Sequence, residues 1–217
     1  MKTNIDLQRD ILEELKWEPS VNAADIGVSV HDGVITLTGH VPSYAEKHGA
    51  ERAAKRVLGV KAVANELDVK LPGSFMRTDE DIASACLSAF RFNYAVPDEK
   101  IKVVVTSGWV TLEGEVEWQF QKDAAMRTVL GLTGVRGVSN NVGVKPHVAP
   151  KDVKNKIEAA FKRNAEIDAR RISVEARDGK VILHGSARSW SERDEAQQAA
   201  WAAEGVTAVE NQIKITP

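Results

Sequence analysis

The sequence predicts an α+β protein built from three tandem αββαβ domains, each a three-stranded mixed sheet with two helices on one face. The first observation is a repeated phrase: GVKAVANELDV begins at Gly59 and returns as GVRGVSNNVGV at Gly134 and as GVTAVENQIKI at Gly205. The same offsets of 75 and then 71 residues relate three further sets: Asp6, Asp81 and Asp152; Gly39, Gly114 and Gly185; Asn65, Asn140 and Asn211. Constant offsets over several anchors indicate an internal repeat without insertions.

The repeats divide the chain into three domains and two linkers. We expect domains at residues 3–69, 78–144 and 150–215, with linkers at 70–77 and 145–149. Proline and glycine in the segments KLPGSFMR and KPHVA suit linkers. A domain of this size buries only about 60% of the surface of its unfolded chain, so each should be marginally stable alone.

Each repeat is expected to open with a helix. Leu7, Ile11 and Leu15 are four residues apart and form one apolar stripe, as in a helix that packs on a core. The equivalent residues are Ile82, Cys86 and Phe90 in the second repeat, and Val153, Ile157 and Phe161 in the third. Because isoleucine takes the place of Cys86 in both other repeats, we interpret this cysteine as a core residue and not as a nucleophile.

A β-hairpin should follow the first helix. Ile26 and Val28 alternate with polar residues, and Ile35 and Leu37 do so after a short turn, which is the period of a half-buried strand. The turn dipeptides are Asp32-Gly33, Ser107-Gly108 and Asp178-Gly179. Such dipeptides accept the positive φ angles of a two-residue hairpin turn.

A second helix and a third strand complete the repeat. Ser43-x-x-Glu46 and Ser189-x-x-Glu192 each predict a capping box at the helix start. A glycine then ends the helix, and the repeated phrase supplies the third strand. We interpret the recurring glycines and asparagines as structural anchors, because turn chemistry explains them without a ligand: Gly39, Gly59, Asn65, Gly114, Gly134, Asn140, Gly185, Gly205 and Asn211.

Composition narrows the functional classes. With 29 Lys+Arg against 31 Asp+Glu, the formal net charge is −2, so no nucleic-acid partner is expected. The opening segment MKTNIDLQRDILEELKW has no unbroken apolar core, which predicts a cytoplasmic location, or a periplasmic one if the chain is exported by another route or is a mature form. No apolar run is long enough for a transmembrane segment. The single cysteine excludes an internal disulfide and a cysteine-based zinc site, and no cofactor or metal is expected.

The motifs resemble a known family. VSVHDGVITLTGHV, then a helix, then GVKAVANELDV is similar to the BON domain, named for bacterial osmotically inducible protein Y and nodulation-associated proteins, and the two later copies match the same pattern. The resemblance implies a non-enzymatic binding module associated with phospholipid membranes, envelope integrity and osmotic stress. Osmotic-stress relatives are usually exported to the periplasm and carry fewer copies. A potassium-sensing relative joins one such domain to a LysM domain, for which no segment is left here.

The opening of the third repeat is the predicted lipid or partner surface. Its basic residues are Lys151, Lys154, Lys156, Lys162, Arg163, Arg170 and Arg171. Each Lys or Arg near an anionic membrane adds on the order of 1 kcal/mol to binding. A solvated helix face is the alternative interpretation.

A second set of residues is predicted to contact a neighbouring repeat or a partner: Val104, Trp109, Trp118, Phe120 and Trp190. Strand alternation puts Val104 and Trp109 on the sheet face away from the helices. Trp118 and Trp190, like Tyr44, fall where the second strand meets the second helix, and packing at the helix start is the simpler explanation for these three aromatics.

We therefore expect a stress-associated adaptor in which three tethered modules add weak contacts to anionic phospholipid surfaces or protein partners. Homo-oligomers are compatible with this prediction, and a holdase-like chaperone for unfolded clients is the alternative. RNA binding is weaker, because GLTG at 131–134 spells the GxxG of a KH domain but the other repeats lack its first glycine. No recurring set of acid, base and nucleophile indicates an enzyme.

Overall fold

The computed structural model describes residues 2–145, 152–165 and 167–216. The first repeat contains α1 (Asn4–Trp17), β1 (Ile26–His31), β2 (Val34–Val41), α2 (Tyr44–Arg56) and β3 (Ala62–Val69). The second contains α3 (Asp79–Arg91), β4 (Ile101–Thr106), β5 (Trp109–Val116), α4 (Gln119–Leu130), β6 (Gly137–Asn140) and β7 (Gly143–Val144). The third contains α5 (Val153–Arg163), β8 (Ile172–Arg177), β9 (Lys180–Ala187), α6 (Trp190–Trp201) and β10 (Ala208–Ile215). Short 3-10 turns lie at Ala23–Asp25, Gly73–Phe75 and Asp98–Lys100.

Each repeat folds into the predicted mixed sheet with two helices on one face. The first two strands pair antiparallel, and the third runs parallel to the second, for example with Leu37 opposite Asn65. The second repeat differs from the expected single third strand, because its third strand is divided into β6 and β7, which both pair with β5. Between them, Asn141 still donates its backbone N–H to the carbonyl of Leu112, so the interruption is short.

The hairpin turns have the positive φ angles that their dipeptides predict. Asp32 has φ 51° and Gly33 has φ 84°, the paired positive values of a two-residue hairpin turn. Gly39 is required for a different reason. Its φ is 116°, and a Cβ there would collide with the backbone carbonyl oxygen of Asp25.

Three separate cores hold the three repeats. The predicted stripe of α1, from Leu7 to Leu15, packs into the first core, and its counterparts on α3 and α5 pack into the other two. Cys86 is completely buried among these residues, and burial raises the pKa of its thiol to about 11. The cysteine is therefore a core residue, as the sequence predicts.

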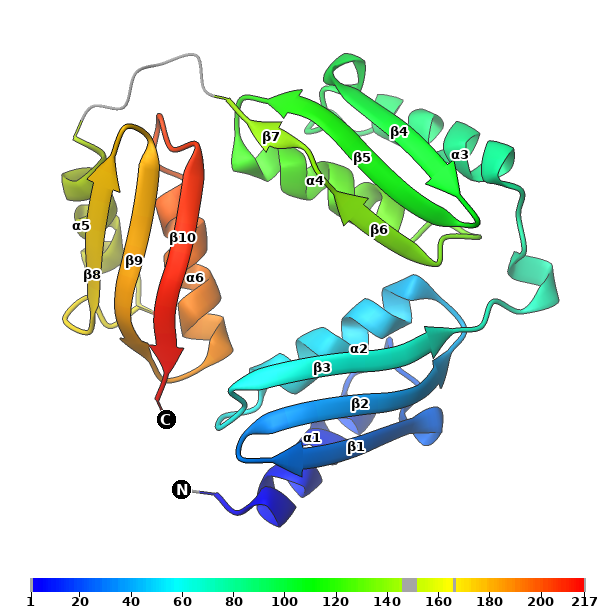
Figure 1. The fold of residues 1–217 in the computed structure, drawn as a ribbon, viewed down its shortest axis with the longest axis horizontal. Coiled ribbons are helices and arrows are strands. Elements are labelled where there is room, and N and C mark those ends of the chain that lie inside the picture. The colour runs from blue at the N-terminus through cyan, green and yellow to red at the C-terminus, as the bar shows by residue number, and fades with distance from the viewer. Residues whose placement is uncertain (1, 146–151, 166, 217) are drawn as a thin grey trace.

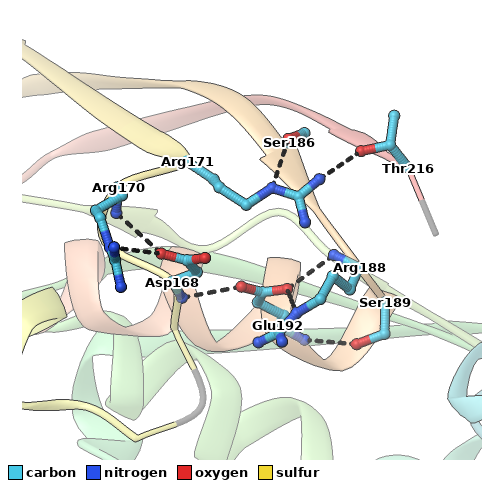
Figure 2. A network of polar contacts seen from close by, with 8 residues as sticks. All are labelled: Asp168, Arg170, Arg171, Ser186, Arg188, Ser189, Glu192 and Thr216. Carbon is cyan, nitrogen blue, oxygen red and sulfur yellow. Dashed lines mark hydrogen bonds and ion pairs between the residues drawn. The ribbon is translucent and has the colours of Figure 1, made fainter.

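The second helices of the first and third repeats begin differently from a capping box. Ser43 Oγ accepts the backbone N–H of Glu46 at 3.2 Å, as predicted. The reciprocal half of the prediction is wrong, because the carboxylate of Glu46 accepts the backbone N–H of Asn22 at 2.6 Å. Figure 2 shows the equivalent in the third repeat, where Glu192 accepts the backbone N–H of Asp168 at 2.9 Å. These glutamates thus tie the second helix to the loop before the first strand.

Glu192 is buried but remains charged. Burial alone would raise the pKa of its carboxyl, but backbone hydrogen bonds from Arg188 and Asp168 and the Arg188 guanidinium hold that pKa below its ordinary value. A buried carboxylate of this kind is stabilised only while all its donors stay in place.

The three repeats are arranged around a common centre (Figure 1). All three sheets face the viewer in this view, and α2, α4 and α6 lie on the inner side. Repeats distant in sequence touch there, because α2 contacts α6 and Trp190 packs against the first core. Within the described part of the chain, no helix combines the length and apolar character needed to cross a membrane.

Candidate functional site

The last turn of the first helix places a basic residue and a second exposed side chain at the same position in every repeat. These residues are Lys16 and Trp17, Arg91 and Phe92, and Lys162 and Arg163, which the offsets of 75 and 71 residues relate to one another. We call them the helix-end pairs. The side chains of Trp17 and Phe92 are 82% and 92% exposed, so folding does not account for these aromatics.

Helix geometry explains why the pairs face solvent. Leu15 is the last core residue of α1, and Phe90 and Phe161 are its counterparts on α3 and α5. Each residue turns a helix by about 100°, so the two residues that follow point away from the core. Basic residues at this end also suit the negative end of the helix dipole, but an exposed Trp or Phe has no such role.

The basic members of the pairs are available for a ligand. Within the described residues, Lys16, Arg91 and Lys162 make no ion pair. The second repeat adds Tyr94, which is fully exposed two residues beyond Phe92. In the first and second repeats, the end of the first helix therefore exposes an aromatic ring next to a cation, a pair suited to the boundary between lipid and water.

The structure places the predicted basic residues of the third repeat in different surroundings. Lys162 and Arg163 form the helix-end pair of α5. Lys154 and Lys156 each lie 3.8 Å from a carboxylate, of Glu158 and Glu204 respectively. Lys151 lies outside the described residues.

Arg170 and Arg171, the last two members of that set, lie before β8 (Figure 2). Arg170 is 3.9 Å from the carboxylate of Asp168. The guanidinium of Arg171 donates to Ser186 Oγ at 3.1 Å and to Thr216 Oγ1 at 3.0 Å. Arg171 thus helps to hold the edge of the sheet.

The outer sheet face of the second repeat exposes Val104 and Trp109 to about half of their full area, at 50% and 49%. Trp109 Nε1 donates to Ser139 Oγ at 2.9 Å. Its ring covers Gly137, which is its partner in the register of β5 and β6. The Trp109 side chain therefore already contacts its own sheet through its indole N–H and its ring, and only the rest of it is exposed.

The aromatics at the starts of the second helices have unequal surroundings. Trp118 and Phe120 stay exposed at the start of α4. Trp190 is different, because two cations contact its ring: Lys55 Nζ, which belongs to the first repeat, lies 5.2 Å from the ring centroid, and Arg193 Cζ lies 4.8 Å from it. Tyr44 packs against the second core, and burial is the main reason that the pKa of its phenol is raised.

The recurring asparagines join the third strand to the second helix. Asn65 Nδ2 donates to the carbonyl of Lys47, and its Oδ1 accepts the backbone N–H of Leu67. Asn140 and Asn211 make the same pair of contacts in the other repeats. These contacts account for the recurring asparagines without a ligand. No group of His, Cys, Asp or Glu in the described segments could hold a metal ion.

Sequence reasoning did not single out Lys16, Trp17, Arg91 or Phe92. The signal was present, because Trp17 and Phe92 occupy equivalent positions that lie off the apolar stripe of their helices. An aromatic residue that recurs outside the core pattern is a candidate for contact with something other than the fold.

The comparisons with known proteins agree with the repeat structure. The family model described as the BON domain matches residues 5–70, 78–146 and 151–217. "Osmotically-inducible protein Y" of Escherichia coli (strain K12) is 33% identical over 58% of this chain and 65% of its own length. "Outer membrane lipoprotein DolP" of Haemophilus influenzae (strain ATCC 51907 / DSM 11121 / KW20 / Rd) is 32% identical over 58% of this chain and 63% of its own length. The chain thus covers slightly less than two thirds of either relative.

Among solved structures, CdsD, a structural protein of the type III secretion system of Chlamydia trachomatis, is 17% identical. The match covers 98% of this chain and 93% of CdsD, with a TM-score of 0.28. At this score the likeness supports no conclusion about fold or function.

Proposed function

Because the chain belongs to the BON domain family and contains three copies of the domain, we propose that it is a non-enzymatic protein that binds anionic phospholipid surfaces through its helix-end pairs. The observation that supports this most strongly is the exposure of Trp17 and Phe92, each preceded by a basic residue that makes no ion pair with the described part of the chain. Trp and other amphipathic rings favour the level of the lipid headgroups, where Lys and Arg meet anionic phosphates.

Three copies of the site add to the binding. One basic residue near an anionic membrane contributes on the order of 1 kcal/mol, which alone gives weak attachment. After the first repeat has bound, the others bind at a high effective concentration. The helices of all three repeats lie behind their sheets in Figure 1.

An envelope location and a role in osmotic stress also belong to the proposal. The names of the two relatives support this part of the proposal, since one is an outer membrane lipoprotein and the other is osmotically inducible. The cytoplasmic location expected from the opening segment finds no support in these names.

Sedimentation with vesicles tests the proposal. We expect the protein to sediment with anionic vesicles at low salt, to be released at high salt, and to remain free of neutral vesicles. Charge reversal at Lys16, Arg91 and Lys162 should abolish binding. Reversal of Lys154 and Lys156 is the control, because these side chains already lie near carboxylates.

The second candidate is binding of a protein partner, including an unfolded client or another copy of this chain, through Val104 and Trp109. The half-exposed apolar surface of these two residues on the outer sheet face favours it. This candidate replaces the first under two results. The protein binds neither anionic nor neutral vesicles, and it suppresses the aggregation of an unfolded client in a way that Trp109→Ser abolishes.

A further inference from the structure

A cavity of about 620 Å³ lies in the first repeat, away from its helix-end pair. Residues from the start of α1, the β1–β2 turn and the segment after α2 line it: Lys2, Asn4, Leu7, Asp32, Gly33, Leu58, Gly59 and Lys61. Its volume is within the range of small-molecule sites, about 300 to 1,000 Å³. Leu7 and Leu58 provide apolar surface and Lys61 provides positive charge, so the lining is amphipathic.

The second repeat has a cavity in the equivalent place. It is smaller, about 200 Å³, and is lined by Arg77, Asp79, Gly108, Gly134 and Arg136 together with Leu71, Met76 and Ser107. By the offset of 75 residues, Lys2 corresponds to Arg77 and Lys61 to Arg136. Both basic positions are therefore retained in the two repeats.

The backbone holds Lys61 and Arg136 in the same way. The N–H of Lys61 donates to the carbonyl of Gly33 at 2.8 Å, and that of Arg136 to Gly108 at 2.9 Å. The aliphatic stem of each side chain lies over the same glycine. The glycine contacts thus fix the backbone and the aliphatic part of each side chain, and the charged group extends from there.

The third repeat shows that folding does not require this cation. Thr207 stands at the equivalent position and donates its N–H to the carbonyl of Gly179 at 2.8 Å. The backbone contact is kept while the positive charge is absent. The positive charge at positions 61 and 136 is therefore not explained by the fold.

The charges around the first cavity favour an anion at Lys61. Lys2 Nζ lies 2.6 Å from a carboxylate oxygen of Asp10 and is already neutralised. Within the described residues Lys61 makes no ion pair. The carboxylate of Asp32 lies at the rim with its side chain 81% exposed, so water screens its effect on the cavity.

We propose that this cavity binds an amphipathic anion, with a phosphate or carboxylate head at Lys61 Nζ and an acyl chain against Leu7 and Leu58. The inference deepens the proposed lipid contact and rests on it for the choice of an acyl chain. The smaller cavity of the second repeat has room for a head group without a chain. The ligand is either a free single-chain amphiphile or one lipid of a bilayer, and both present the same chemistry.

Titration of the full chain with dodecyl phosphate below its micelle concentration tests the proposal. Binding should shift the methyl NMR signals of Leu7 and Leu58. Lys61→Thr, which copies the third repeat and should fold normally, should weaken binding by about tenfold, as expected for loss of one charge-assisted contact. Thr207→Val is the control at the equivalent position and should leave the affinity unchanged. Unshifted methyl signals, or equal affinity in Lys61→Thr, would overturn the proposal.

Anionic vesicles separate the two sources of the ligand. If Lys61→Thr weakens both vesicle and dodecyl phosphate binding, a bilayer lipid occupies the cavity; if it weakens only the latter, a free amphiphile does. Replacing Trp17 and Phe92 by serine separates this proposal from the proposed function. That variant should lose vesicle binding but still bind dodecyl phosphate, so either proposal can fail alone.

Discussion

Lys55 Nζ lies 5.2 Å from the ring centroid of Trp190, although the two residues belong to the first and third repeats. Arg193 faces the same ring at 4.8 Å. Cation–π contacts of this kind contribute about 0.5 to 2 kcal/mol, depending on desolvation. The pair therefore helps to hold together two domains that a complete third domain separates in the sequence.

Removal of the Trp190 ring should weaken the contact between the first and third repeats. We expect Trp190→Ala to leave each repeat folded but to separate the first repeat from the third, because the ring packs against the first core. Small-angle X-ray scattering should then show a larger radius of gyration. Trp118→Ala, at the start of α4, is the control and should not change it. An unchanged radius for Trp190→Ala would show that the contact does not hold the repeats together.

Glu192 should make stability depend on pH in the acid range. Its pKa is lower in the folded protein than the ordinary 4.5, so its contribution is present above that value and is lost as pH falls through the folded pKa. Glu192→Gln should lower the free energy of unfolding by about 1 to 3 kcal/mol near neutral pH and flatten its acid dependence. Denaturant unfolding at several pH values measures both effects. The exposed Glu113→Gln should behave as the parent protein, and equal curves for the Glu192 variant would refute the assignment.

Replacement by alanine should change the stability of the protein very differently at two glycines of the second repeat. Gly114 has φ 135°, and a Cβ there would collide with the carbonyl oxygen of Lys100. Gly114→Ala should therefore destabilise the protein by at least about 2 kcal/mol. Gly131 has φ −94° and open space around it, so Gly131→Ala should change stability little. Chemical denaturation compares them, and similar midpoints would contradict the account of this anchor.

The thiol of Cys86 should be inert in the folded protein. It is fully buried and its pKa is about 11, so almost no thiolate exists at about pH 8. We expect a thiol reagent to label it only at the rate of unfolding and rapidly in concentrated guanidinium chloride. Fast labelling of the native chain would place the residue outside the core.

Local features of this fold could be predicted from sequence, and contacts between distant segments could not. The stripe from Leu7 to Leu15 and the Asp32-Gly33 turn depend on nearby residues, so their patterns suffice. Glu46 and Glu192 instead bind a loop that tertiary folding brings to them, and their local sequence suggests a capping box. The contact of Trp190 with Lys55 depends on how the repeats dock.

The candidate site was only half predictable. Lys162 and Arg163 belonged to a visible basic cluster. In the same cluster, Lys154 lies beside Glu158 at i,i+4 on its own helix, a pair that spacing alone could indicate, whereas Lys156 lies beside Glu204, which only tertiary folding brings near it. Trp17 does not stand out by itself. Its importance follows from its exposure and from its equivalence to Phe92.

The most direct test of the central claim compares two double variants in sedimentation with anionic vesicles. Trp17→Ser with Phe92→Ser removes the aromatics of the helix-end pairs, and Val104→Ser with Trp109→Ser removes the half-exposed apolar residues of the outer sheet face. The account predicts that the first variant loses most of its vesicle binding at low salt, whereas the second binds like the parent protein. Equal binding by the first variant and the parent would contradict it, and loss of binding only in the second would assign the contact to the sheet.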